Sequence, residues 1–185
     1  MIPSFEECIW LMKYHDMPLH IMRHSIVVER IATFILKNLN FGLSFPLVSA
    51  GALLHDIAKH RCIGTEKDHA EEGARICKEH GLDKISQIVR YHIVLNRFDP
   101  YDDIDEVQIV YYADKRVNGE EVVSLDERLS YILDKYGKDD PAICDRIEKN
   151  FMLCRKVEEK IFNYLDFRPE DIKRFMRALN FSKLS

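Results

Sequence analysis

The feature that most constrains this chain is a histidine followed by an aspartate in the middle of an apolar segment. His55 and Asp56 lie within residues 47–59, which are apolar on nearly every side and which Pro46 suits as the first turn of a helix. Burial of an unpaired carboxylate among hydrophobic side chains is costly, so such a group is usually ion-paired or bound to a metal. The segment therefore predicts a buried polar site inside a helical core.

Helical spacing of apolar residues continues over most of the chain. Ser4 and Glu7 form a capping-box pattern for a first helix that ends near His15, and a second helix is expected from Leu19 to Leu39. Cap residues and glycines predict further helices from Asp68 to His80, from Asp83 through His92 and Asn96, from Asp103 to Gly119, from Ser124 to Gly137, from Asp140 onward and after Arg168. Because no run of alternating hydrophobicity is convincing, we expect an all-α fold.

Composition and charge argue against several classes of protein. The 185 residues suit one domain, and the net charge of −4 leaves no overall basic surface for a nucleic-acid polymer. No apolar stretch reaches the roughly 18 residues of a membrane span, and the N-terminus does not resemble a signal peptide. The five scattered cysteines contain no Cys-x-x-Cys pair, which favours reduced thiols. We therefore expect a cytoplasmic protein with neither a nucleic-acid polymer nor a membrane as partner.

Several polar side chains fall on the apolar faces of these expected helices. They come from five helices and are His24, His55, Asp56, His69, His92 and Asp114. A lone histidine on such a face is more often a satisfied core residue than a ligand, and a purely structural polar network is an alternative for the whole set. One shared site explains six such residues better than several independent exceptions do. Metal ligands converge in the same way inside helical bundles.

The order of these residues resembles a known family. His24, then His55-Asp56, then Asp114 matches the H…HD…D pattern of the HD superfamily of metal-dependent phosphohydrolases. The string from His55 to Lys59 resembles its HDIG subset, with Ala58 where glycine is usual. The resemblance covers about residues 20–120. It implies an HD-domain-like helical bundle with a metal site in the core, and a single domain in which the C-terminal helices of residues 121–185 pack on that core.

The resemblance also implies a ligand set. His24, His55, Asp56 and Asp114 would hold one divalent ion, and His69 and His92 lie where two-metal members carry ligands of a second ion bridged by Asp56. One or two ions are therefore expected. A shell of imidazoles and carboxylates without thiolate suits Mn, Fe, Co, Ni or Zn, and Mg less well.

Phosphate chemistry at such a site needs cationic side chains. Lys59 lies one turn from His55 and Lys115 follows Asp114, so we expect Asp56, Lys59 and Lys115 to be the catalytic residues. Weaker candidates for contact with a phosphate are Arg23, Arg61, Arg97 and Arg116. For Lys59, Arg61 and Arg116, a solvated charge near a helix end is the alternative reading.

The sequence thus predicts a metal-dependent phosphohydrolase. Its expected substrate is a small phosphate ester or anhydride, with a nucleotide favoured, and metal-activated hydroxide is the expected nucleophile. One alternative is a symmetrical dinucleoside polyphosphate hydrolase, whose six-ligand order is similar. Another is a non-catalytic nucleotide-binding regulatory HD module, which the complete ligand set disfavours. The stretch after Asp126 is expected to cover the pocket or to form the surface of a homodimer.

Overall fold

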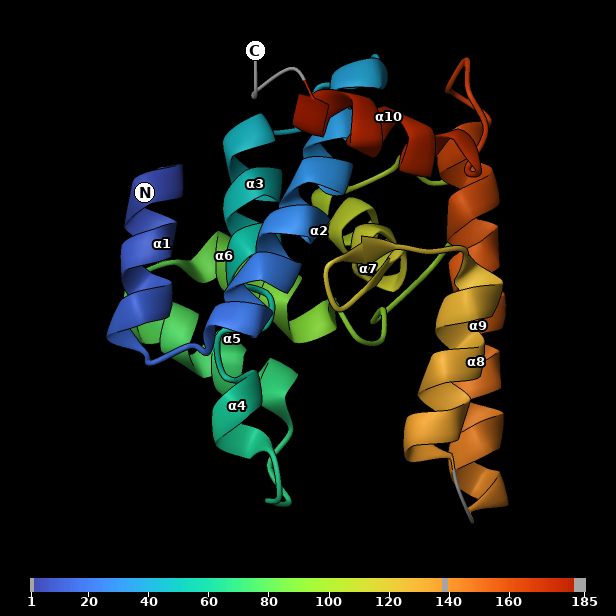
Figure 1. Cartoon of the computed structure of the whole chain (residues 1–185). Helices are drawn as coiled ribbons and strands as arrows, with labels where there is room; N and C mark the ends of the chain where they lie inside the picture. Colours follow the sequence, from blue (N-terminus) through green and yellow to red (C-terminus); the bar gives the residue numbers. More distant parts are fainter. Residues whose placement is uncertain (1, 138–139, 182–185) are drawn as a thin grey trace.

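Helices account for most of the fold, which confirms the all-α prediction. The computed structural model describes residues 2–137 and 140–181. Its helices are α1 (Phe5–Tyr14), α2 (Leu19–Asn38), α3 (Phe45–Leu54), α4 (Lys59–Cys62), α5 (His69–Glu79), α6 (Asp83–Tyr91), α7 (Glu106–Lys115), α8 (Leu125–Tyr136), α9 (Pro141–Phe162) and α10 (Asp171–Phe181) (Figure 1). None of the helices in the described part of the chain is long and apolar enough to cross a bilayer.

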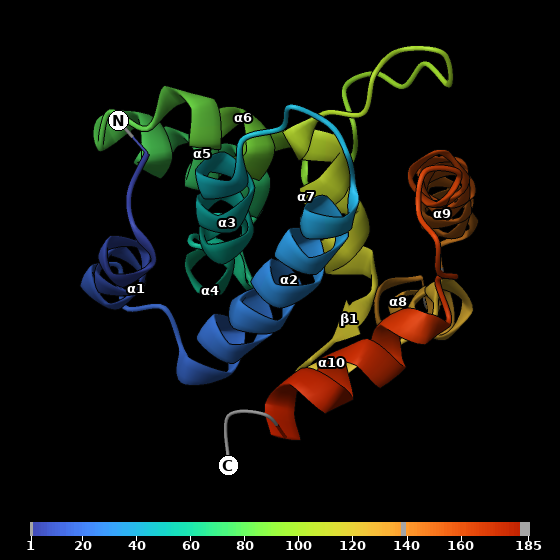
Figure 2. The same cartoon turned by 90° about the horizontal axis from the view of Figure 1, so that it is seen from above.

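The centre of the molecule is a group of closely packed helices. α2 packs against α3 and α7, α3 also packs against α6, and α5 lies along α6 (Figure 2). Gly73 makes the approach of α5 to α6 possible, because a Cβ atom there would lie only 2.8 Å from Val89 Cγ1. The small buried residues of α5, Ala70, Gly73 and Ala74, thus allow close packing. They bring the start of α5 to the end of α6.

Most helix starts follow the capping signals in the sequence. Ser4 with Glu7 and Ser124 with Glu127 form capping boxes that begin α1 and α8. The Asp68 carboxylate accepts a hydrogen bond from the backbone N–H of Ala70 at the start of α5. These local hydrogen bonds satisfy N–H groups that have no partner within the helix.

Two predicted helices end earlier than expected. The helix predicted over residues 47–59 ends at Leu54, so His55 and Asp56 lie in the turn before α4. The helix predicted to run through Asn96 ends at Tyr91, which leaves His92 as its C-terminal cap residue. In both cases an imidazole bonds a carbonyl of the last helical turn, a group without a partner in the helix. Hydrophobic periodicity carries no information about such a bond.

A small hairpin was also missed. α7 ends at Lys115, and Val117–Asn118 (β1) pairs antiparallel with Glu121–Val122 (β2). Gly119, predicted to end the helix, lies in the hairpin turn with a φ of 60°, a conformation that favours glycine. Strands of two residues are too short for alternation to be recognised in the sequence.

The C-terminal helices contact the central group at several points. α9 packs against α7, and α10 packs against α2 and β2. Arg116 links these parts, because its guanidinium donates to the carbonyls of Val123 and Pro169 and pairs with Glu158. The weaker expectation that Arg116 contacts a phosphate is therefore replaced by a structural role at this junction.

Candidate metal centre

Asp56 lies at the middle of the candidate site. Its Oδ2 atom is 3.4 Å from His55 Nε2 and 3.9 Å from His24 Nε2. Its Oδ1 atom is 3.3 Å from His69 Nε2 and 3.5 Å from His92 Nε2. The two carboxylate oxygens therefore face different pairs of imidazoles.

Asp114 completes one side of this arrangement. Its Oδ1 atom lies 3.1 Å from His24 Nε2 and 3.5 Å from His55 Nε2. The structure thus brings together all six residues singled out from the sequence, from α2, the turn after α3, the start of α5, the end of α6, and α7. Whether they bind an ion stays a prediction.

Backbone carbonyls fix the orientation of each of three imidazoles. The Nδ1 atoms of His24, His55 and His92 lie 2.9, 2.7 and 2.6 Å from the carbonyl oxygens of Gly119, Ala52 and Val89, respectively. Because a carbonyl oxygen only accepts, each Nδ1 carries the hydrogen and each Nε2 faces the carboxylates. Metal-binding histidines are typically oriented in this way.

The atoms at the centre fit a divalent cation. His55 Nε2 and Asp56 Oδ1 are buried and have no hydrogen-bond partner among the described residues. Two groups of possible ligand atoms are present, and within each group the atoms lie no more than 4.8 Å apart. One group comes from His24, His55 and Asp114, and the other comes from His55, Asp56 and His92. Two ligand atoms each about 2.1 Å from an ion stand roughly 3.0–3.4 Å apart in octahedral or tetrahedral geometry. The contacts of 3.1–3.5 Å described above are close to these values.

Burial and charge shift the pKa values at the centre. Burial alone would raise the pKa of the Asp56 and Asp114 carboxyls, but the neighbouring lysines and histidines hold both well below the usual range. Burial opposes a charged His55, yet the two aspartates raise its pKa to about 9. Burial lowers the pKa of His92 to about 4, which keeps this imidazole neutral and able to act as a ligand. The position of His55 between the two aspartates thus favours the positively charged form of its imidazole.

The two lysines expected to be catalytic lie beside the aspartates. Lys59 Nζ donates to Asp56 Oδ2 at 2.6 Å, and its side chain is 31% exposed. Lys115 is buried, donates to the His92 carbonyl at 2.8 Å and lies 3.7 Å from Asp114 Oδ2. Burial opposes charge on Lys59, but Asp56 raises its pKa, whereas burial lowers the pKa of Lys115. Lys59 is thus the more accessible of the two.

Two of the other arginine candidates have partners outside the six-residue centre, and the third is exposed. Arg61 donates to the His15 carbonyl, Arg23 pairs with Glu120 on the surface, and Arg97 is exposed. Sequence reasoning missed the carbonyl groups that orient the imidazoles. For His55 and His92, the available signal was a histidine directly after an apolar helix. No signal in the sequence indicated that the Gly119 carbonyl in the hairpin would orient His24.

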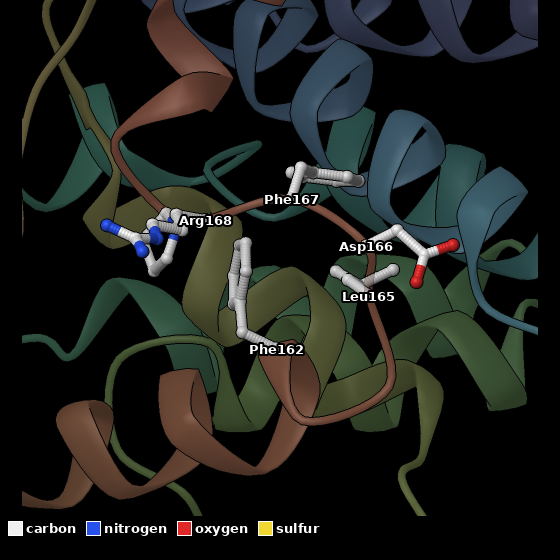
Figure 3. A pocket seen from close by; sticks show the side chains of 6 residues that line it. Phe162, Leu165, Asp166, Phe167 and Arg168 are labelled. Atoms are coloured by element: carbon white, nitrogen blue, oxygen red, sulfur yellow. The ribbon is translucent and has the colours of Figure 1, made fainter.

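A hollow lies away from the metal centre, where α9 leads toward α10. It is lined by Phe162, Leu165, Asp166, Phe167, Arg168 and Pro169 (Figure 3). This lining contains one carboxylate and neither imidazole nor thiol, so it lacks the mixed donor set of the metal centre.

Comparison with known proteins identifies the class to which this arrangement belongs. The bundle and its His and Asp cluster have the layout of a helical metal-binding domain, and the family model described as HD domain matches residues 21–119. The match covers more than half of the chain and includes all six residues of the candidate centre. The protein therefore belongs to the HD domain family, which indicates a metal-dependent hydrolase that binds a divalent metal.

The curated relatives give no substrate. An uncharacterized protein of Methanocaldococcus jannaschii is 29% identical over 140 residues, or 67% of this chain and 82% of that protein. A tRNA (cytidine(56)-2'-O)-methyltransferase of Thermoplasma volcanium is 34% identical over 94 residues, or 50% of this chain and 27% of the enzyme. The enzyme of the same name from Picrophilus torridus is 29% identical over 152 residues, or 73% of this chain and 41% of the enzyme. The chain thus spans less than half of either methyltransferase. No solved structure matches the chain.

Proposed function

We propose that this protein is a phosphohydrolase that acts on a small phosphate ester or anhydride, a nucleotide being the favoured substrate class. The observation that carries the proposal is that the two carboxylate oxygens of Asp56 face different imidazoles. His55 and His24 face Oδ2, and His69 and His92 face Oδ1. A carboxylate with ligands on both sides is suited to bridge two cations. Such a pair, when bound, supplies an activated water and neutralises charge on the phosphoryl oxygens.

The residues around the centre suit this reaction. Asp56 and Asp114 supply negative charge for the cations, and the backbone carbonyls keep the imidazoles oriented. Lys59, partly exposed beside Asp56, is proposed to contact the phosphate and stabilise the charge that develops on it. Lys115 is proposed to add positive charge from behind the centre and to position His92 through its carbonyl. A cytoplasmic location, one domain and a homodimer remain parts of the proposal.

Two other functions fit the observations less well. The regulatory alternative, a module that binds a nucleotide without hydrolysing it, needs no oriented set of six ligands. Methyl transfer to tRNA is the named activity of two relatives. We do not extend it to this chain, because the chain spans only 27% and 41% of those proteins.

The test is to measure metal content and hydrolysis together. Protein purified without chelator would be analysed for bound metal. It would then be assayed with Mn²⁺, Co²⁺, Ni²⁺, Zn²⁺, Fe²⁺ and Mg²⁺ against nucleoside monophosphates and symmetrical dinucleoside polyphosphates. We expect about two equivalents of metal and turnover of at least one substrate class. Metal-loaded protein that binds nucleotides without turnover would support the regulatory alternative instead.

Asp114→Asn is the matched variant for this test. It keeps the shape of the side chain but removes the charge that faces His24 and His55. We expect loss of one ion and of at least about a hundredfold in turnover while the protein stays folded, because one metal ion supplies several kcal/mol of transition-state stabilisation. Full turnover in this variant would refute the assignment of the site, and loss of folding alone would favour a structural network.

A further inference from the structure

Among the described residues, Arg128 is a buried cation without an anionic partner. It lies in the first turns of α8 (Leu125–Tyr136), beyond the residues matched by the HD domain, and is 8% exposed. Among residues 2–137 and 140–181, no carboxylate forms an ion pair with it, and its Nε atom is buried without a hydrogen-bond partner. Arg116 and Arg155, by contrast, pair with Glu158 and Asp126. Burying an unpaired charge is costly, so this position calls for an explanation.

The contacts of Arg128 link it to the hairpin that orients His24. Its Nη1 atom donates to Asn118 Oδ1 at 3.0 Å, and Asn118 directly precedes Gly119 in the hairpin. The carbonyl of Gly119 is the group that holds His24 Nδ1 at 2.9 Å. The guanidinium is thus connected to His24, a predicted metal ligand, through the Asn118 side chain and the backbone from Asn118 to the Gly119 carbonyl.

Arg128 also lies near the two lysines beside the aspartates, since its charge acts on both Lys59 and Lys115. Arg128 adds a positive charge that neither carboxylate of the centre pairs with. Lys59 and Lys115 already lie within ion-pair distance of Asp56 and Asp114, before any metal ion is counted. A divalent ion adds further positive charge. An anionic ligand would offset the charge of Arg128, and a planar guanidinium is well suited to bind a phosphate through two parallel hydrogen bonds.

We propose that Arg128 binds a phosphate oxygen of the substrate at the metal centre, with Asn118 orienting its guanidinium. The inference rests on the proposed phosphohydrolase function and extends it, because α8 then supplies part of the substrate site. Arg128 is a substrate-binding residue in this scheme and leaves the metal ligands intact.

The test uses inorganic phosphate as the probe. The full chain, loaded with Mn²⁺, would be titrated with phosphate by calorimetry, as wild type and as Arg128→Gln, Arg128→Lys and Arg155→Gln. The last variant removes an arginine charge that is paired with Asp126 on the surface. We expect the phosphate Kd to rise about tenfold or more in Arg128→Gln and several-fold in Arg128→Lys, which keeps the charge but loses the planar donor. Arg155→Gln should bind like wild type, and bound Mn²⁺ should be unchanged in all variants.

The outcomes separate this inference from the proposed function. Any folded Arg128 variant that binds phosphate as tightly as wild type overturns the role of Arg128, even if the wild type hydrolyses nucleotides with the expected metal dependence. If Arg128→Gln does not fold, Arg128→Lys alone decides by the same criterion. Phosphate binding that depends on Arg128 without hydrolysis of any ester would leave the anion site in place and refute the hydrolase. Wild-type protein that binds no phosphate would overturn the role of Arg128, while the metal and hydrolysis assays would still decide the proposed function.

Discussion

The two sides of Asp56 differ in charge and in access. On the Oδ2 side, His24 and His55 are buried and share a second carboxylate, Asp114. On the Oδ1 side, His69 and His92 face a single carboxylate oxygen, and the His69 side chain is 26% exposed. We therefore expect the Oδ2 side to hold an ion more tightly. The Oδ1 side offers fewer protein donor atoms, so an ion held there would leave room for water or substrate, as catalytic metal sites do.

The largest expected effect comes from the residue that both sides share. Asp56→Asn removes the charge facing all four imidazoles, so we expect loss of both ions and a fall in turnover of at least about a thousandfold. Elemental analysis, kinetics and circular dichroism would check this, with the exposed Asp102→Asn as control. Two retained equivalents of metal would mean that Asp56 does not bridge.

A smaller effect is expected when only the exposed side is changed. His69→Ala should lower the metal content from about two equivalents to one and reduce turnover about tenfold to a hundredfold, because the ion on the Oδ2 side remains. His20→Ala is a matched control, since His20 is exposed and lies one turn before His24 on α2. A metal content of one equivalent in both wild type and His69→Ala would show a mononuclear site.

The smallest expected effect concerns two histidines without a carboxylate between them. His15 Nε2 and His80 Nε2 lie 2.9 Å apart, and burial, followed by the charges of Arg61 and His80, lowers the pKa of His15. A histidine with a lowered pKa binds its proton more weakly when folded, so its stabilising effect is complete above the unfolded pKa of about 6.5 and decreases as the pH falls below it.

This gives a test in metal-free protein. The decrease in Tm from pH 7.5 to pH 5.0 should be about 2 °C smaller in His15→Gln than in wild type. In protein purified without chelator, His80→Ala should leave the metal content unchanged, because an imidazole pair alone is a poorer site than one with carboxylates. An identical pH dependence of Tm in wild type and His15→Gln would show that protonation of His15 does not affect stability.

Much of the fold and of the candidate centre was predictable because the signals are local. Capping residues such as Ser4 and Ser124 act within one turn of the chain, and an aspartate on an apolar helical face needs a partner wherever it is buried. The ends of α3 and α6 were less predictable. There, a side-chain bond from His55 or His92 to a carbonyl replaced the helical continuation that the apolar pattern indicated.

The sequence by itself determined the helical class of the fold, the six residues of the centre and the family that they indicate. Residue types and their spacing are sufficient for this, because helical periodicity assigns each side chain to a buried or an exposed face. Only the tertiary structure decided which oxygen of Asp56 faces which imidazole, that Gly119 orients His24, and that Arg128 is buried with no ion-pair partner in the part of the chain that the structure describes. These features join residues far apart in the chain, and no local pattern fixes the direction in which their atoms meet.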